Sequence, residues 1–328
     1  MAGVAAGALG AQTQDGARFS SGVELINVTA TVTDDDGRFA DGLTRDDFTV
    51  YEDGVLQEIS HFSSERVPVS LGLVLDASGS MTEEKMSRAR SAIDRLIFDQ
   101  LGADDELFFE EFSTTPRIRQ GWTTDRRAIS RAVSRVDPAG GTAMYDAIAE
   151  AIPLAGEGKH QKKAVLVISD GNDTNSQFTA YDIRQIVRES EVMVYALGVD
   201  GSATMVRRAP RVQIPFPFPM PGGGRRRPGL PVPPPIGGGN GTWTRSAGER
   251  VNEDALRQIT DDSGGRTEII RGFGDLDAAA ERLADELSRQ YSLGYASTGK
   301  KDGQWHTIKV EVKDRRLNVR ARRGYVAS

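Results

Sequence analysis

The run Val69-Ser-Leu-Gly-Leu-Val-Leu-Asp76-Ala-Ser78-Gly-Ser80 decides the fold of this chain. Its first seven residues are almost all apolar, as expected for a strand that is covered on both faces of a parallel sheet. A carboxylate and two hydroxyls then follow at alternate positions, Asp76, Ser78 and Ser80. All three are hard oxygen ligands of the kind that Mg²⁺ prefers. The run therefore predicts a buried strand that ends in a metal site.

Downstream of this run, apolar strands alternate with amphipathic helices. Strands are predicted at residues 107–112, 164–169, 192–197 and 266–270. Helices are predicted to begin near Ser80, Asp125, Thr142, Thr179, Asn252 and Asp275. Strand–helix alternation of this kind is typical of a doubly wound α/β domain with a mostly parallel, Rossmann-like sheet. We assign residues 67–290 to this domain.

The two ends of the chain are predicted to be β-rich. Val28, Ala30 and Val32 alternate with threonines, the period-2 pattern of a half-buried strand, and Ile308 and Val310 repeat it near the other end. Each end is too short to form a stable domain alone. We therefore expect residues 22–66 and 291–328 to combine into one smaller, discontinuous β-sandwich.

Residues 201–250 interrupt the α/β pattern. Ten of the 14 prolines of the chain lie between Pro210 and Pro235, mixed with glycines and the run Arg225–Arg227. Because prolines remove backbone donors, this segment is predicted to be a solvated loop rather than part of a core. A tolerated surface insertion is the favoured interpretation. A recognition arm for an aromatic groove or an acidic partner is the alternative.

Composition limits the functions open to the chain. Its 328 residues carry a net charge of −6, which argues against a nucleic-acid-binding surface. It has no cysteine, and no apolar run reaches the length of an integral membrane helix. Residues 1–21 begin small and apolar and then become polar, so they are interpreted as either a disordered start or the end of a secretory signal. We expect an exported protein, whether periplasmic, at the cell surface or secreted.

Two further segments repeat the chemistry that follows Asp76. Asp170 comes directly after the apolar strand at 164–169, and Thr142 precedes a helix. Ligands of open α/β sheets bind beyond the carboxyl ends of the strands, so these residues should converge although 94 positions separate the two aspartates. We expect Asp76, Ser78, Ser80, Thr142 and Asp170 to surround one Mg²⁺ ion. Such a set leaves a position that an incoming carboxylate can fill.

Asp76-Ala-Ser78-Gly-Ser80, Gly141-Thr142 and Ser169-Asp170-Gly171 resemble the metal-ion-dependent adhesion site of von Willebrand factor type A domains. The resemblance covers roughly residues 69–290, and the flanking segments 43–54 and 323–325 extend it to bacterial VWFA-related domain proteins.

This resemblance implies that Ser78, Ser80 and Thr142 contact the ion, which is Mg²⁺ or alternatively Mn²⁺ or Ca²⁺. It implies that Asp76 and Asp170 act mostly through water and by fixing the hydroxyls. It also implies binding to a protein that supplies an acidic side chain, and no catalysis.

Each of these residues also has an ordinary structural interpretation. Ser80 could simply cap a helix with Glu83, Thr142 could be another cap, and Asp170 could belong to a turn. Their joint occurrence favours the metal site. Roles at the surface or near the site, without ligation, are predicted for Asp146, Asn172 and Asp173, and ordinary roles at a strand edge for Glu110 and Glu111.

Three other functions are compatible with some of these residues. A Mg²⁺-dependent phosphotransferase of the haloacid dehalogenase type needs a second acid two residues after the strand-end aspartate, but Ser78 stands there and cannot transfer the proton at neutral pH. The three histidines, His61, His160 and His306, are scattered and support no hydrolase triad. A structural module whose metal site is unused would need the same ligands, so the sequence does not separate it from an adhesion module.

Overall fold

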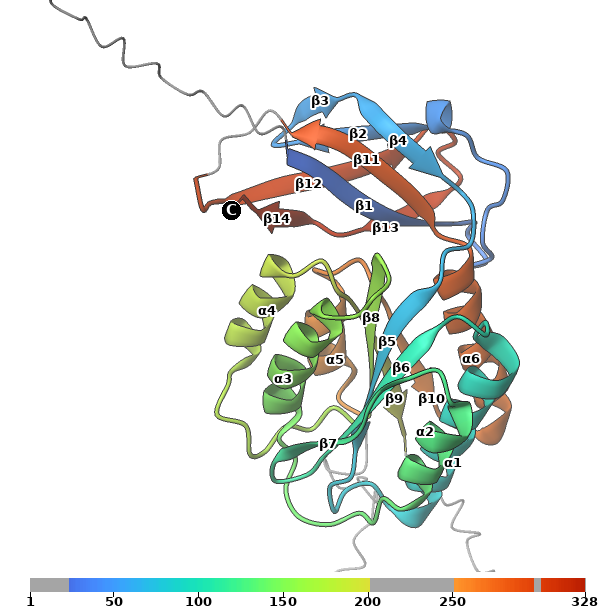
Figure 1. The fold of residues 1–328 in the computed structure, drawn as a ribbon, viewed down its shortest axis with the longest axis vertical. Helices are drawn as coiled ribbons and strands as arrows, with labels where there is room; N and C mark the ends of the chain where they lie inside the picture. The colour runs from blue at the N-terminus through green and yellow to red at the C-terminus, as the bar shows by residue number, and fades with distance from the viewer. Residues whose placement is uncertain (1–23, 201–250, 298–301, 328) are drawn as a thin grey trace, which may run out of the picture.

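A six-stranded sheet forms the centre of the larger of two bodies (Figure 1). The computed structural model describes residues 24–200, 251–297 and 302–327, so the predicted insertion and the signal-like start lie outside the described residues. The strands run in the order β10-β9-β8-β5-β6-β7, and only the β6–β7 pair is antiparallel. Their bounds are β5 Val69–Asp76, β6 Glu106–Phe112, β7 Pro116–Thr123, β8 Lys162–Ser169, β9 Met193–Val199 and β10 Thr267–Ile270.

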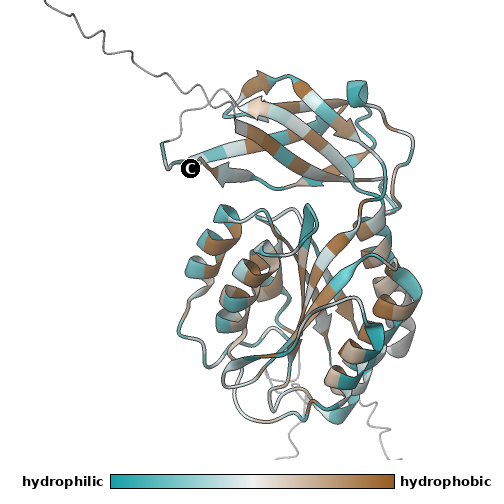
Figure 2. Ribbon diagram, viewed as in Figure 1, coloured by the Kyte–Doolittle hydropathy of each residue, from teal (hydrophilic) through white to brown (hydrophobic). Residues whose placement is uncertain are grey.

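In the described residues, six α-helices cover the two faces of this sheet, three on each. One face carries α1 Glu83–Arg95, α2 Arg126–Ser134 and α6 Phe273–Ser288, and the other carries α3 Met144–Gly156, α4 Ala180–Glu189 and α5 Glu253–Thr260. A short π-helix, η2 Leu96–Gln100, continues α1. All eight residues of β5 are buried, with Leu73 packed towards α1 and Val74 towards α3. In Figure 2 the hydrophobic colour follows the central strands and the inward sides of the helices.

The β-rich ends form two four-stranded sheets that share one core. The sheet orders are β13-β1-β11-β4 and β14-β12-β2-β3. The strand bounds are β1 Glu24–Thr33, β2 Phe48–Glu52, β3 Val55–Gln57, β4 Ile59–Ser63, β11 Tyr291–Ser297, β12 Trp305–Val312, β13 Asn318–Ala321 and β14 Gly324–Val326, with a 3-10 turn, η1 Arg45–Asp47, before β2. Because β1 pairs with β11, and β2 with β12, neither end of the chain completes a sheet alone.

This architecture confirms the predicted fold, an α/β domain beside a discontinuous β-sandwich. Val28, Ala30 and Val32 are fully buried in the sandwich core, as their alternation indicated. The turn at Asp53 and Gly54 joins β2 to β3 with positive φ at both residues, which explains the Asp-Gly pair. In the part of the chain that the structure describes, no helix is long and apolar enough to cross a bilayer.

One alternative interpretation, Ser80 as a helix cap, was wrong, and one strand was missed. The helix after Asp76 is capped by Thr82, whose hydroxyl accepts from the Lys85 backbone N–H, and not by Ser80. In addition, β7 lies at the edge of the sheet next to β6, where no strand was predicted. The sequence of β7 is mostly polar and its side chains are half-buried or exposed, so the usual apolar signal of a strand is weak.

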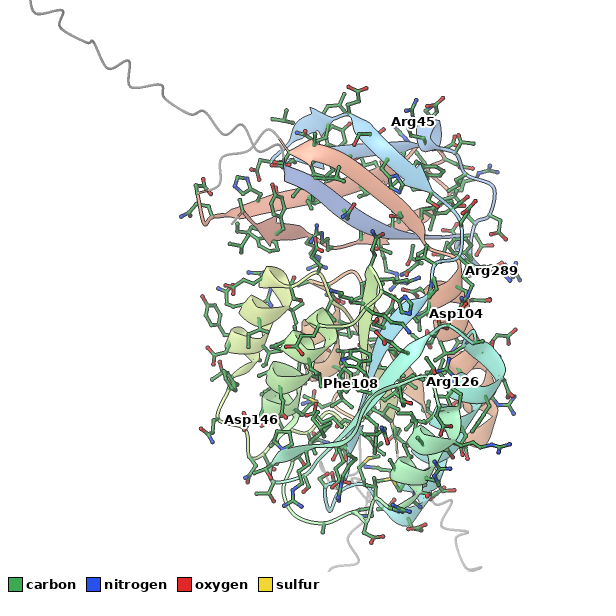
Figure 3. The ribbon with its side chains drawn as sticks, viewed as in Figure 1. Arg45, Asp104, Phe108, Arg126, Asp146 and Arg289 are labelled. Carbon is green, nitrogen blue, oxygen red and sulfur yellow. The ribbon has the colours of Figure 1, made fainter. Side chains whose placement is uncertain are left out.

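Because β7 covers β6, Glu110 and Glu111 are not ordinary edge carboxylates. Glu110 is fully buried on the same face as Phe108, and among the described residues neither of its oxygens finds a hydrogen-bond partner. Phe108, labelled in Figure 3, meets Trp122 of β7 edge to face at 4.8 Å. Glu111 instead pairs with Arg119 of β7 at 2.5 Å. Burial raises the pKa of Glu110 to about 9, helped by the charge of Glu150.

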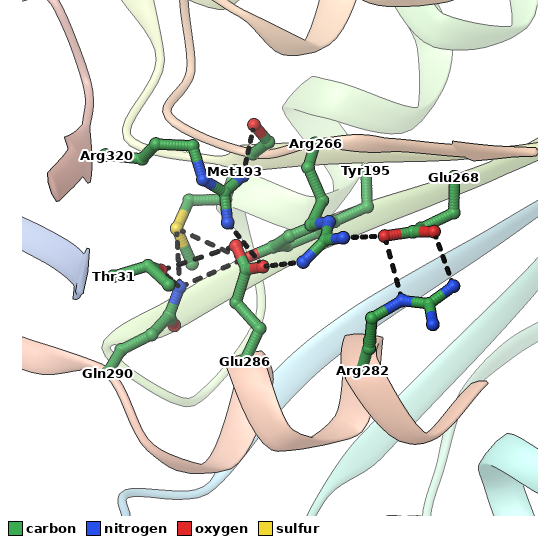
Figure 4. A network of polar contacts seen from close by, with 10 residues as sticks. Thr31, Met193, Tyr195, Arg266, Glu268, Arg282, Glu286, Gln290 and Arg320 are labelled. Atoms are coloured by element: carbon green, nitrogen blue, oxygen red, sulfur yellow. Dashed lines mark hydrogen bonds and ion pairs between the residues drawn. The ribbon is translucent and has the colours of Figure 1, made fainter. Parts of the chain in front are cut away.

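The two bodies are joined by a buried polar network around Glu286 of α6 (Figure 4). One Glu286 oxygen accepts from Arg320 of β13 at 2.6 Å and lies 3.7 Å from Arg266, and the other accepts from Thr31 of β1 at 3.3 Å. Gln290 donates to Thr31 and to the Tyr195 hydroxyl of β9. The network therefore holds α6 and the central sheet against the sandwich.

Replacing Glu110 by Gln should stabilise the protein above neutral pH. The pKa of Glu110 is raised from 4.5 to about 9 on folding, so the folded state keeps a proton that the unfolded state releases. As far as Glu110 is concerned, the free energy of unfolding is highest below pH 4.5. It falls as pH rises towards 9, because over this range only the unfolded state releases the proton. Urea unfolding at pH 8 should show Glu110→Gln more stable than wild type, by on the order of 2–4 kcal/mol. Glu111→Gln is the control and should keep the wild-type fall in stability with pH; the same fall in Glu110→Gln would contradict the assignment.

Replacing Glu286 by Ala should destabilise the whole protein, because Arg266 and Arg320 would lose their shared buried acid. We expect a loss of about 2–3 kcal/mol, less than for a fully buried pair because both arginines are partly exposed. Chemical denaturation measures it. Asp285→Ala, on the same helix but paired with Arg289 at the surface, should cost less than about 0.5 kcal/mol. Equal losses in the two variants would contradict the role given to Glu286.

Candidate metal centre

The first part of the candidate centre is the loop that follows β5. The Asp76 carboxylate is fully buried; one oxygen accepts from the Ser78 backbone N–H at 2.8 Å and the other from the Ser169 hydroxyl at 2.5 Å. The hydroxyl oxygens of Ser78 and Ser80 are 2.9 Å apart. Burial raises the pKa of Asp76 to about 6 against these hydrogen bonds, and the negative charge of Asp170 adds to the rise.

Asp170, at the end of β8, is the second acid of the centre. Its side chain is fully buried, and its Oδ2 lies 2.8 Å from the ammonium nitrogen of Lys85. Its Oδ1 accepts from the Asn172 backbone N–H at 3.3 Å, and its carbonyl accepts from Asn252 at 2.7 Å. The loop is therefore fixed both to α1 and to the start of α5.

Thr142 lies just before α3 and is 3% exposed. Its backbone N–H donates to the Thr174 hydroxyl at 3.1 Å, and its carbonyl accepts from Thr174 and Asn175. The preceding loop meets the Asp76 loop directly, because the Gly79 N–H donates to the Gly140 carbonyl at 3.1 Å. Gly140 has φ +84° and no room for a side chain beside Thr114, which explains a glycine at this point.

The five predicted residues therefore occupy three loops at one edge of the sheet. Asp76, Ser78 and Ser80 share a single loop; Asp170 is joined to it through Ser169, and Thr142 through the Gly79–Gly140 hydrogen bond. This edge is the end of the α/β body that faces away from the sandwich (Figure 1).

Asp146 and Asp173 hold the loop that follows Asp170. Asp146, labelled in Figure 3, accepts from the backbone N–H groups of Gln177 and Phe178 at 2.8 and 3.0 Å. Asp173 accepts from the Tyr145 backbone N–H and the Ser176 hydroxyl. Both carboxylates tie this loop to the start of α3 and hold the segment around Thr142 in place.

The sequence reasoning missed Lys85. Its side chain is only 3% exposed, and it is the cation beside Asp170. A signal was available, because Lys85 stands four residues before Ala89 and eight before Ile93, on the inward face of α1. A lysine on an apolar helix face indicates a buried acid opposite.

A second group of possible ligands lies in the sandwich. Glu52, Asp53 and His306 each offer one ligand atom within 4.8 Å of the others. His306 Nδ1 is 2.7 Å from Asp53, and the other ring nitrogen is 3.3 Å from Asp302. This group is formed by the β2–β3 turn and β12, far from the loops around Asp76, and any metal-binding experiment must distinguish the two.

Comparison with known proteins places the central part of the chain in a family. Residues 71–172 match the family model described as the von Willebrand factor type A domain. An uncharacterized protein of Synechocystis sp. is 29% identical over 137 residues, which is 40% of this chain and 32% of that protein. Inter-alpha-trypsin inhibitor heavy chain H2 of Sus scrofa is 24% identical over 155 residues, or 42% of this chain and 16% of the heavy chain. The chain thus matches a third or less of these relatives.

A solved structure from Catenulispora acidiphila, titled von Willebrand factor type A, is similar at 15% identity and a TM-score of 0.46, over 94% of this chain and 75% of that one. Domains of this family are typical metal-dependent adhesion modules. The family match runs from β5 to the loop after β8, and all five predicted site residues lie within it. Residues 71–172, the first part of the α/β body, are therefore assigned to the von Willebrand factor type A domain family.

Proposed function

We propose that Asp76, Ser78, Ser80, Thr142 and Asp170 hold one divalent cation, and that the cation binds an acidic side chain of a protein partner. The observation that carries the proposal is the 2.9 Å separation of the Ser78 and Ser80 hydroxyl oxygens beside the buried Asp76. Mg²⁺ binds six oxygens at about 2.0–2.1 Å, so neighbouring ligands of one ion lie about 2.9 Å apart. The two hydroxyls, which hydrogen-bond to each other in this structure, already lie at the spacing that such a pair of ligands needs.

The charges of these residues favour an exchangeable acidic ligand. Ser78, Ser80 and Thr142 are neutral donors, while Asp76 is already engaged by Ser78 and Ser169 and is suited to orient them. When bound, the ion would supply an electrophilic position that a carboxylate can fill. Mg²⁺ is the proposed ion, with Mn²⁺ and Ca²⁺ as the alternatives.

Phosphotransfer is disfavoured by the state of Asp76. A nucleophilic aspartate needs a carboxylate oxygen that is accessible to the substrate. Both Asp76 oxygens accept hydrogen bonds and the residue is fully buried. Ser78, at the position of the required second acid, cannot act as a general acid. We also propose that the chain is exported.

Asp76→Ala should weaken metal binding. Asp76 orients the Ser78 loop and contributes negative charge, so its loss should raise the Kd for Mg²⁺ or Mn²⁺ by about tenfold or more. Calorimetric titration of chelator-treated protein measures the Kd. The matched control is Asp53→Ala, which removes an acid from the Glu52–Asp53–His306 group and should bind the ion like wild type. If Asp53→Ala loses binding and Asp76→Ala binds normally, the ion binds in the sandwich and not at the Asp76 loop.

Partner binding should require both the ion and Asp76. Immobilised wild-type protein should retain its partner from an extract of the source organism in Mg²⁺ and release it in EDTA. Excess free glutamate should also displace it if the partner supplies a carboxylate. At the same Mg²⁺ concentration Asp76→Ala should retain less of the partner than wild type, and Asp53→Ala should behave like wild type. A partner that stays bound in EDTA would contradict the proposed mode of binding, and metal binding without any metal-dependent partner would favour a structural module.

A further inference from the structure

Lys85 is a buried cation that faces a predicted metal-binding acid. Its ammonium nitrogen lies 2.8 Å from Asp170 Oδ2, and both side chains are essentially inaccessible, at 3% and 0% exposed. Asp76 and Asp170 are both fully buried, and the negative charge of Asp170 acts on Asp76. Burying a charge is costly unless it is paired. The Lys85–Asp170 pair therefore offsets one of the two buried negative charges.

The position of Lys85 in α1 does not benefit the helix. Lys85 is the third residue of α1, in the first turn. A cation there is unfavourable, because the unsatisfied N–H groups make this end of a helix positive. The first-turn acids Glu83 and Glu84 have the preferred charge, whereas Lys85 has the opposite one. Its placement is therefore explained by Asp170 and not by helix stability.

We propose that Lys85 is the resident counter-cation of the metal centre, holding Asp170 when no ion is bound and weakening the binding of a divalent ion. The inference rests on the proposed function and names how that site is regulated. Asp170 Oδ2 faces Lys85 at hydrogen-bond distance, so an ion must share this carboxylate with the ammonium or displace it. Repulsion between the two cations opposes binding further.

The same lysine has a consequence for the partner. With Asp76 and Asp170 ionised, Lys85 leaves the site with one net negative charge before the ion binds and one net positive charge afterwards. An ion balanced only by two aspartates would leave the site neutral. Lys85 therefore makes the loaded site more attractive to an anionic group, at the expense of affinity for the ion.

The test is metal binding by Lys85→Met, which keeps the length of the side chain and removes its charge. Calorimetric titration with Mg²⁺ and with Mn²⁺ should give a Kd about tenfold or more below that of wild type. Without metal the variant should melt at a lower temperature than wild type, because Asp170 loses its partner. Saturating metal should then raise its melting temperature by more than it raises that of wild type.

Two further variants keep the result interpretable. Lys162→Met is the matched control, because Lys162 is also buried but lies at the opposite end of β8 from Asp170, eight residues or about 26 Å away. It should bind the ion with wild-type affinity. Lys85→Gln retains a hydrogen-bond donor without the charge, and it decides the question if Lys85→Met does not fold. It too should bind the ion more tightly than wild type.

If the wild type binds the ion and the folded Lys85 variants bind it no more tightly, the role of Lys85 is overturned and the proposed function stays intact. The absence of binding by wild type and by every variant would overturn the metal function itself, and the inference with it. Tightening in Lys162→Met equal to that in Lys85→Met would show a general charge effect and also overturn the inference.

Discussion

The parallel pairing of β5 with β8 is the constraint on which the rest of the structure depends. The register sets Leu75 opposite Ile168, so both strands end at the same level of the sheet. Asp76 and Ser169 then meet in a buried 2.5 Å hydrogen bond, although 93 residues separate them. The pairing is held by apolar side chains on both faces of the sheet, which means that the geometry of the candidate centre is supported by the whole core of the α/β body.

A centre of this kind buries two carboxylates, and the surrounding residues lower the free-energy cost of burying their charge. Asp76 receives hydrogen bonds from Ser78 and Ser169, and Asp170 receives one from Asn172 and faces Lys85. Because these partners are supplied by loops and by α1, the carboxylates are oriented before any ion arrives. Preorganisation by the hydrogen bonds of the loops lowers the cost of binding, whereas the ammonium group of Lys85 opposes binding. It also makes the position of α1, through Lys85, part of the chemistry of the site.

At the other end of the sheet, polar contacts attach the sandwich to the α/β body. Glu286 and Gln290 link α6 and its following residues to β1, β9 and β13. The chain leaves the sandwich through β4 to enter β5 and returns to it through β11 after α6 (Figure 1). The two bodies are therefore joined by two chain crossings as well as by the network. Of the helices, α6 packs on the central sheet and also bonds to strands of the sandwich.

The sequence by itself determined most strands, the helices of the α/β body and the loops that carry Asp76, Thr142 and Asp170, because period and composition are local properties that burial enforces. It also determined that the β-rich ends combine, since neither could be stable alone. Only the tertiary structure decided which residues meet across the fold. The polar strand β7 gives no local signal, yet it turns Glu110 from an edge residue into a buried acid. Lys85 likewise becomes a partner of Asp170 only when α1 packs against the end of β8, because an ion pair between residues 85 positions apart depends on packing and not on sequence spacing.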